Sequence, residues 1–260
     1  MDWLITLPVS AMTLVILAAT YAVTALIYLL VTRLAVGERA RAFKAISPGM
    51  LPPLSVVFAL LVGFLAAQVW SDADRAATAV NREAGALRGA VLLAEQFPGE
   101  PDTRLRELIR QHIQTAVREE WPLMARHGAT LSIIPGALAD ALKLALELDP
   151  RTPGQTIAQR ELVASIQTAL DARRQRIVLS GSSVNVVKWG ALLAQAALIL
   201  LAIAMVHCDN RTANRIILTI FATGTAAAII LIAAYNRPFS GSLAVRPALL
   251  LQVMPEADGT

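Results

Sequence analysis

Four long uncharged stretches, interrupted by a charged middle, constrain this chain more than any other feature. They cover residues 3–32, 45–71, 189–208 and 216–236. A helix needs about 20 apolar residues to cross the hydrocarbon core of a bilayer. Helices also satisfy every backbone polar group internally, which lipid requires. We therefore predict four membrane-spanning helices, over about residues 10–32, 51–71, 189–206 and 216–235.

The charged residues gather between the second and third stretches. Residues 71–188 hold 15 of the 23 Lys and Arg and 14 of the 19 Asp and Glu. This partition excludes a uniformly soluble protein, a disordered chain and a disulfide scaffold. The single cysteine, Cys208, excludes an internal disulfide and any zinc cluster built from cysteines.

We predict an all-α integral membrane protein with two helical hairpins and a central helical domain. The first hairpin covers residues 1–70, the charged domain 71–186, the second hairpin 187–236, and a short extended tail 237–260, in which weak alternation over Ser242–Val253 favours an extended segment. The first span lacks a positive segment before it and exceeds the usual signal-peptide core, so we interpret it as a retained span. Spans two and three are expected to extend into the central domain, as one helix over about 53–96 and another from about residue 155. Ser180-Gly181-Ser182-Ser183 is expected to loosen the second of these helices near the membrane surface.

A series of short motifs is distributed along most of the chain. They are Pro53-Leu54-Ser55, Val62-Gly63-Phe64-Leu65-Ala66-Ala67-Gln68-Val69-Trp70, Asp74-Arg75-Ala76, Glu83-Ala84-Gly85-Ala86-Leu87-Arg88, Glu119-Glu120-Trp121-Pro122, Asp171-Ala172-Arg173-Arg174-Gln175-Arg176 and Arg237-Pro238-Phe239-Ser240-Gly241. Together they resemble the uncharacterised bacterial bestrophin-like membrane proteins. The Pro-Leu-Ser entry and the Gly-Phe pair are also similar to the second span of true bestrophins, which are pentameric anion channels. The resemblance implies a pentamer that conducts anions such as chloride, and a cytoplasmic central domain in an inner-membrane protein.

One face of the second span provides candidates for a pore lining. Residues at helical spacing on this face are Leu54, Phe58, Leu61, Leu65 and Gln68. In a symmetric oligomer such a face could form an apolar neck, whereas an ordinary interpretation is packing against neighbouring helices. Trp70 and Trp189 stand at span ends, as membrane-interface anchors do.

Charged residues of the central domain are interpreted as structural ion pairs. Asp72 and Asp74 are expected to pair with Arg75 or Arg173, and Glu120 with Arg82 or Arg88. The basic run that contains Arg173 and Arg174 either pairs with Glu83 or Asp74 or contacts phospholipid headgroups. The aspartates offer too few oxygens for Ca²⁺, and no two histidines share a metal-binding helical spacing, so no metal site is expected.

Several other functions are disfavoured. The chain carries no phosphate-binding loop, nucleophile elbow or dinucleotide fingerprint, so we expect neither an enzyme nor a cofactor. The central domain is nearly neutral, which disfavours nucleic acid. The expected partners are membrane lipids and further copies of the chain. Basic residues flank both ends of the spans and do not decide the orientation. A membrane-anchored scaffold without transport activity remains the alternative to an anion channel.

Overall fold

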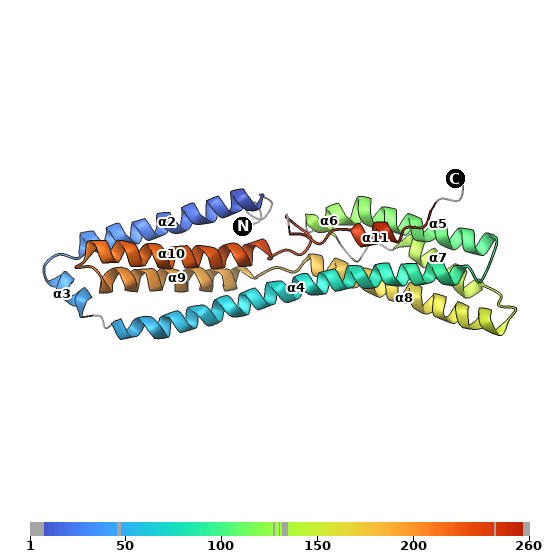
Figure 1. Ribbon diagram of the computed structural model, residues 1–260, viewed down its shortest axis with the longest axis horizontal. Helices are drawn as coiled ribbons and strands as arrows, with labels where there is room; N and C mark the ends of the chain where they lie inside the picture. Colours follow the sequence, from blue (N-terminus) through green and yellow to red (C-terminus); the bar gives the residue numbers. More distant parts are fainter. Residues whose placement is uncertain are drawn as a thin grey trace. The chain divides into compact units, whose positions relative to one another are not determined.

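The computed structural model describes residues 8–45, 48–126, 128, 129, 131, 135–241 and 243–256, and every regular element in these ranges is helical (Figure 1). Four helices in this part of the chain are long and apolar enough to cross a membrane. The elements are α2 (Val9–Leu34), α3 (Glu38–Lys44), η1 (Pro48–Met50), α4 (Leu51–Ala94), α5 (Glu100–Thr115), η2 (Ala116–Glu120), α6 (Trp121–Ala125), α7 (Gly136–Glu147), α8 (Pro153–Ser180), α9 (Val186–Val206), α10 (Arg211–Ala234) and α11 (Ala248–Gln252).

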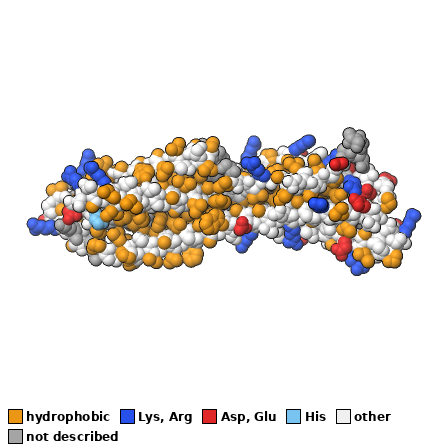
Figure 2. All heavy atoms as spheres, in the orientation of Figure 1, with side chains coloured by type: hydrophobic (Ala, Val, Ile, Leu, Met, Phe, Trp, Pro, Cys, Tyr) orange, Lys and Arg blue, Asp and Glu red, His pale blue; other side chains and the backbone are white. Residues whose placement is uncertain are grey.

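The chain divides into two compact units. Unit 1 contains residues 1–71 and 183–236, and unit 2 contains residues 72–182 and 237–260. In unit 1, α2 packs against both α9 and α10, which form the predicted second hairpin. Its two apolar clusters join these helices to the first half of α4. Apolar side chains cover the visible face of α2, α9 and α10, while Lys, Arg, Asp and Glu are frequent over the helices of unit 2 (Figure 2).

Helix α4 is continuous over 44 residues, as predicted from the sequence. Pro52 and Pro53 lie in its first turn, where a missing backbone N–H costs nothing. Its second half contributes a stripe of small side chains to the core of unit 2, including Ala76, Val80 and Ala84. The same core contains large side chains from α5 and α8, among them Ile109, Leu162 and Ile166.

The predicted continuation of the third span into the central domain is wrong in one respect, because the helix is interrupted. α8 ends at Ser180 and α9 begins at Val186. The Ser180 hydroxyl donates to the Ile177 carbonyl, and Asn185 caps α9 by accepting from the Val187 N–H. The Val184 N–H donates to the Asn236 side chain rather than to a helical carbonyl. Side-chain partners thus replace the helical bonds over this Ser/Gly/Asn-rich connection.

The tail was expected to be extended over residues 242–253, but it contains the short helix α11. Residue 242 itself lies outside the described residues. Pro247 precedes α11 with a φ of −75°, which suits entry into a helix, and Leu250 is fully buried in the core of unit 2. The segment therefore forms a helical turn that buries Leu250, rather than the extended conformation that its weak alternation favours.

Candidate functional site

The predicted pore stripe of α4 faces other helices of the same chain. Leu65 is buried, and Leu54, Phe58 and Leu61 are half-buried among the apolar clusters of unit 1. The Phe58 ring lies 5.9 Å from that of Phe221 on α10, measured between centroids. The Leu54 carbonyl accepts a hydrogen bond from Gln195 on α9. These contacts correspond to the ordinary interpretation of the stripe, which is helix packing within one protomer.

The opposite face of the span is exposed and apolar. Val56, Leu60 and Phe64 follow one another at four-residue intervals, and Phe64 is 72% exposed. Val57 and Gly63 lie beside them and are exposed as well. Sequence periodicity missed this face because both sides of the span are apolar. We define Val56, Val57, Leu60, Gly63 and Phe64 as the free face of α4.

The polar and aromatic candidates at the span ends differ in their surroundings. The Gln68 side-chain oxygen accepts a hydrogen bond of 2.6 Å from the Lys188 ammonium group. Trp70 is 47% exposed, in keeping with an interface anchor, whereas Trp189 is only 7% exposed and packs in the core of unit 1. Trp189 is therefore better described as a core residue than as an anchor.

Unit 2 contains a buried cluster of charged side chains. Glu83 of α4 accepts two hydrogen bonds from Arg176 of α8, at 2.7 Å from Nε and 3.0 Å from Nη2. Arg176 Nη2 also donates to Glu120 at 2.8 Å, and Arg173 Nε donates to Glu120 at 2.7 Å. His112 Nε2 lies 2.9 Å from Glu83 Oε1. We call these residues, Glu83, His112, Glu120, Arg173 and Arg176, the ionic cluster.

Every member of the ionic cluster is buried, with Glu120 the most exposed at 6%, and Glu83 and Arg176 are fully buried. Burial raises the pKa of the Glu83 carboxyl, but the Arg176 charge and hydrogen bonds from His112 and Arg176 outweigh it and lower the pKa to about 2. Burial likewise lowers the pKa of Arg176, but Glu83 and Glu120 hold it above its ordinary value. Two carboxylates thus face two guanidinium groups, which is how buried charges are tolerated.

A local irregularity brings Glu120 into the cluster. Residues 116–120 form a π-helical turn in which the Trp121 N–H bonds to the Ala116 carbonyl, five residues back. Pro122 follows directly and has no N–H to continue the α-helical pattern. A proline at this position favours an end or a kink of the helix, and the structure shows a widened turn before it. Trp121 then lies with its ring centroid 4.6 Å from the Arg176 guanidinium, a cation–π contact.

The predicted ion pairs are only partly present. Glu83, Glu120 and Arg173 belong to the ionic cluster, but Glu120 pairs with Arg173 and Arg176 instead of Arg82 or Arg88. Within the described ranges, no ion pair involves the other candidates, Asp72, Asp74, Arg75, Arg82 and Arg174. Arg176 and His112 were not predicted as cluster members. The three-residue spacing of Arg173 and Arg176, on one helical face, was the available signal.

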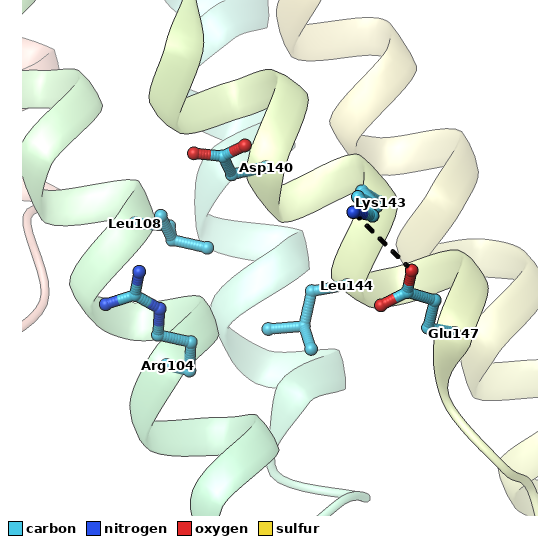
Figure 3. A pocket seen from close by; sticks show the side chains of 6 residues that line it. All are labelled: Arg104, Leu108, Asp140, Lys143, Leu144 and Glu147. Carbon is cyan, nitrogen blue, oxygen red and sulfur yellow. Dashed lines mark ion pairs between the residues drawn. The ribbon is translucent and has the colours of Figure 1, made fainter.

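A small surface pocket of about 150 Å³ lies between α5 and α7. Figure 3 shows Arg104 and Asp140 at its edges and the Lys143–Glu147 ion pair, 3.9 Å long, on α7. All four charged residues are exposed, and the 3.9 Å between Lys143 and Glu147 is long for an ion pair. Together with the small volume of the pocket, this favours a solvated surface over a binding site. Among the described residues, no group of His, Cys, Asp and Glu is arranged to hold a metal ion.

Comparison with known proteins gives one family match, to the bestrophin-like domain, and several fold matches, among them bacterial bestrophin homologues. A family model for the bestrophin-like domain matches residues 18–250. A bacterial bestrophin homologue from Klebsiella pneumoniae, solved by zinc phasing, is 13% identical, with a TM-score of 0.68 over 93% of this chain and 95% of that one. A single-substitution variant of a homologue from that organism is 12% identical, with a TM-score of 0.71 over 93% and 97%. No curated protein matches the sequence.

Proposed function

The chain belongs to the bestrophin-like family, and on this premise we propose that it forms a symmetric oligomer, a pentamer by resemblance, around an anion-conducting pore. In this proposal the free face of α4 lines the pore. This face replaces the stripe from Leu54 to Gln68 as the lining, because that stripe is occupied by contacts within the protomer.

The observation that carries the proposal is the free face itself. Three large apolar side chains, Val56, Leu60 and Phe64, line up along one side of the helix that holds the family's Gly-Phe pair. A ring of such side chains around an axis forms an apolar constriction that can gate by losing its water. Gly63, beside them, lets neighbouring helices approach closely.

Charge on the second half of α4 favours anions over cations. Arg75, Arg82 and Arg88 are exposed, and within the residues that the structure describes none of them forms an ion pair. Asp72 and Asp74 are equally without ion pairs, so the arginines exceed the aspartates by one. On α8, the exposed positive charge of Arg174 is balanced by the exposed Asp171, so the excess remains one. An excess of positive charge raises the local concentration of anions such as chloride.

Chloride flux from liposomes tests the proposal directly. Phe64→Ala is expected to raise flux several-fold over the unmodified protein, because a smaller side chain widens the constriction and weakens dewetting. Phe58→Ala is the matched control. It removes the same ring from the packed face and is expected to leave the flux of the folded protein unchanged within about twofold, since Phe58 contacts Phe221.

The flux experiment also separates the channel from a scaffold. A scaffold predicts no flux above empty liposomes from either variant. A monomer or dimer in gentle detergent would also contradict the proposal, because a pore around a shared axis needs more copies. Equal flux changes from Phe58→Ala and Phe64→Ala would contradict the assignment of the lining to the free face.

We further propose that the protein lies in the inner membrane and that unit 2 is on its cytoplasmic side. Cys208, which follows α9 in the short turn before α10, is partly exposed and is the only thiol of the chain. With unit 2 inside, this turn faces outward, so an impermeant maleimide is expected to label Cys208 in intact spheroplasts. Detergent-lysed spheroplasts give the full labelling level. Labelling that occurs only after lysis would reverse the proposed orientation.

A further inference from the structure

We infer that a groove between α2 and α10 binds an acidic phospholipid. The groove has a volume of about 360 Å³, within the range of small-molecule sites. Its lining includes Tyr21, Thr24, Ala25 and Tyr28 from α2, and Arg215 and Leu218 from α10. All of these residues belong to unit 1. This inference does not depend on channel activity.

The positive charge of the groove is the Arg215 guanidinium, which contacts Tyr28 in two ways. Arg215 Nε donates a hydrogen bond of 3.0 Å to the Tyr28 hydroxyl. The Arg215 guanidinium carbon also lies 5.4 Å from the centroid of the Tyr28 ring. Within the described part of the chain, Arg215 has no carboxylate partner. The guanidinium is therefore oriented by an aromatic residue of another helix while its charge is not neutralised.

The unused donors suit a phosphate group. A guanidinium carries five N–H donors, and Arg215 uses one of them on Tyr28. The Tyr28 oxygen accepts this bond, which leaves its own O–H proton to be donated. Planar guanidinium donors together with a hydroxyl donor match the oxygens of a phosphodiester, and charge-assisted bonds of this kind are the strong ones.

The rest of the groove suits an acyl chain. Ala25 and Leu218 contribute apolar surface to its lining. A second bridge between the same helices, from the Tyr21 hydroxyl to Thr223 at 2.7 Å, lies toward the middle of α2. Tyr21 and Tyr28 are seven residues apart, which is about 10 Å along a helix. A free inorganic anion would use the cationic end alone, whereas a phospholipid matches both the cationic end and the apolar length.

The position along the helices agrees with a headgroup site. Arg215 is the fifth residue of α10, and Arg211 is the first. Arg33 lies in the last turn of α2, at the same end of the helix pair as Tyr28. Basic residues at this level attract anionic lipids to the membrane surface. Arg33, Arg211 and Arg215 are all exposed, but only Arg215 lines the groove, so Arg33 and Arg211 provide general attraction rather than a defined site.

Lipid binding to the purified full chain tests the inference. The protein is placed in phosphatidylcholine nanodiscs, and a labelled phosphatidylglycerol is titrated in. We expect saturable binding that weakens about tenfold in Arg215→Gln, which corresponds to about one strong interaction. Tyr28→Phe keeps the ring and removes the hydroxyl, and is expected to weaken binding about threefold. Arg211→Gln is the matched control, with a change below twofold.

Three outcomes would overturn the inference. Equal losses in Arg215→Gln and Arg211→Gln would mean general surface attraction without a site. Unchanged binding in both Arg215→Gln and Tyr28→Phe would remove the groove from consideration. Displacement of the labelled lipid by millimolar inorganic phosphate would show that the cationic end alone binds, and that the ligand is a free anion rather than a lipid.

Discussion

Replacing Arg176 by methionine is expected to lower the free energy of unfolding by about 3–5 kcal/mol, the usual cost of breaking a buried ion pair from one side. Arg176 is fully buried and bonds to two carboxylates, Glu83 and Glu120. Methionine fills much of the volume but leaves Glu83 with His112 as its only side-chain partner among the described residues. Denaturant titration of the full chain in detergent micelles measures the effect.

Two further variants separate loss of charge pairing from a general sensitivity of α8. Arg174→Met changes an exposed arginine two positions away, which has no ion pair within the described residues, and is expected to alter the unfolding free energy by less than about 0.5 kcal/mol. Adding Glu83→Gln to Arg176→Met removes the uncompensated charge and is expected to recover a substantial part of the loss. A double variant as unstable as Arg176→Met alone would contradict the electrostatic explanation.

The spans and the long α4 helix could be predicted from the sequence because they depend on local properties. Uncharged length predicts a span, and the absence of proline after Pro53 predicts a helix that continues beyond it. The residues that favour a break at 181–185 are also local. The bond that stabilises the broken conformation is not, because the Val184 N–H donates to Asn236, 52 residues further along the chain. A bond of that sequence separation leaves no periodic pattern, so the sequence suggested only a loosened helix.

The proposed pore face of α4 could not be told apart from the packed face in the sequence, for a different reason. Hydrophobic periodicity separates a buried face from a polar one, but both faces of the second span are apolar. Leu61 and Leu60 are adjacent leucines with equal hydrophobicity, yet Leu61 packs within the protomer and Leu60 is exposed. The positions of α9 and α10 decide which of the two faces of α4 is covered. Those positions are a property of the tertiary fold.

The ionic cluster illustrates the same limit for charged residues. From the sequence, Glu120 is expected to pair with Arg82 or Arg88, which both lie on α4. Its partners instead come from α8, 53 and 56 residues along the chain. In the sequence, Arg176 belongs to a basic run with Arg173 and Arg174, and such a run is typical of an exposed helix face. Its three-residue spacing from Arg173 is visible in the sequence, but the burial of that face is not.

The stability of the protein is expected to fall in acid through Glu83. Its pKa is lowered to about 2 in the folded protein from an ordinary value of 4.5. A lowered pKa means that the unfolded chain binds the proton more readily, so the contribution of Glu83 is present above pH 4.5. It is lost as the pH falls from about 4.5 toward about 2. At about 1.4 kcal/mol per pH unit, the total loss is about 3 kcal/mol.

Comparison with Glu83→Gln isolates this contribution from that of the other carboxylates. Glutamine cannot ionise, so the difference in unfolding free energy between the unmodified protein and the variant should shrink by about 3 kcal/mol between pH 5 and pH 2. Glu147→Gln is the matched control, because Glu147 is exposed and contacts Lys143 at 3.9 Å. An exposed pair of this kind contributes little, so Glu147→Gln should change the unfolding free energy at pH 5 by less than about 0.5 kcal/mol. A Glu83→Gln difference that does not change between pH 5 and pH 2 would mean that Glu83 is not held ionised by Arg176 and His112.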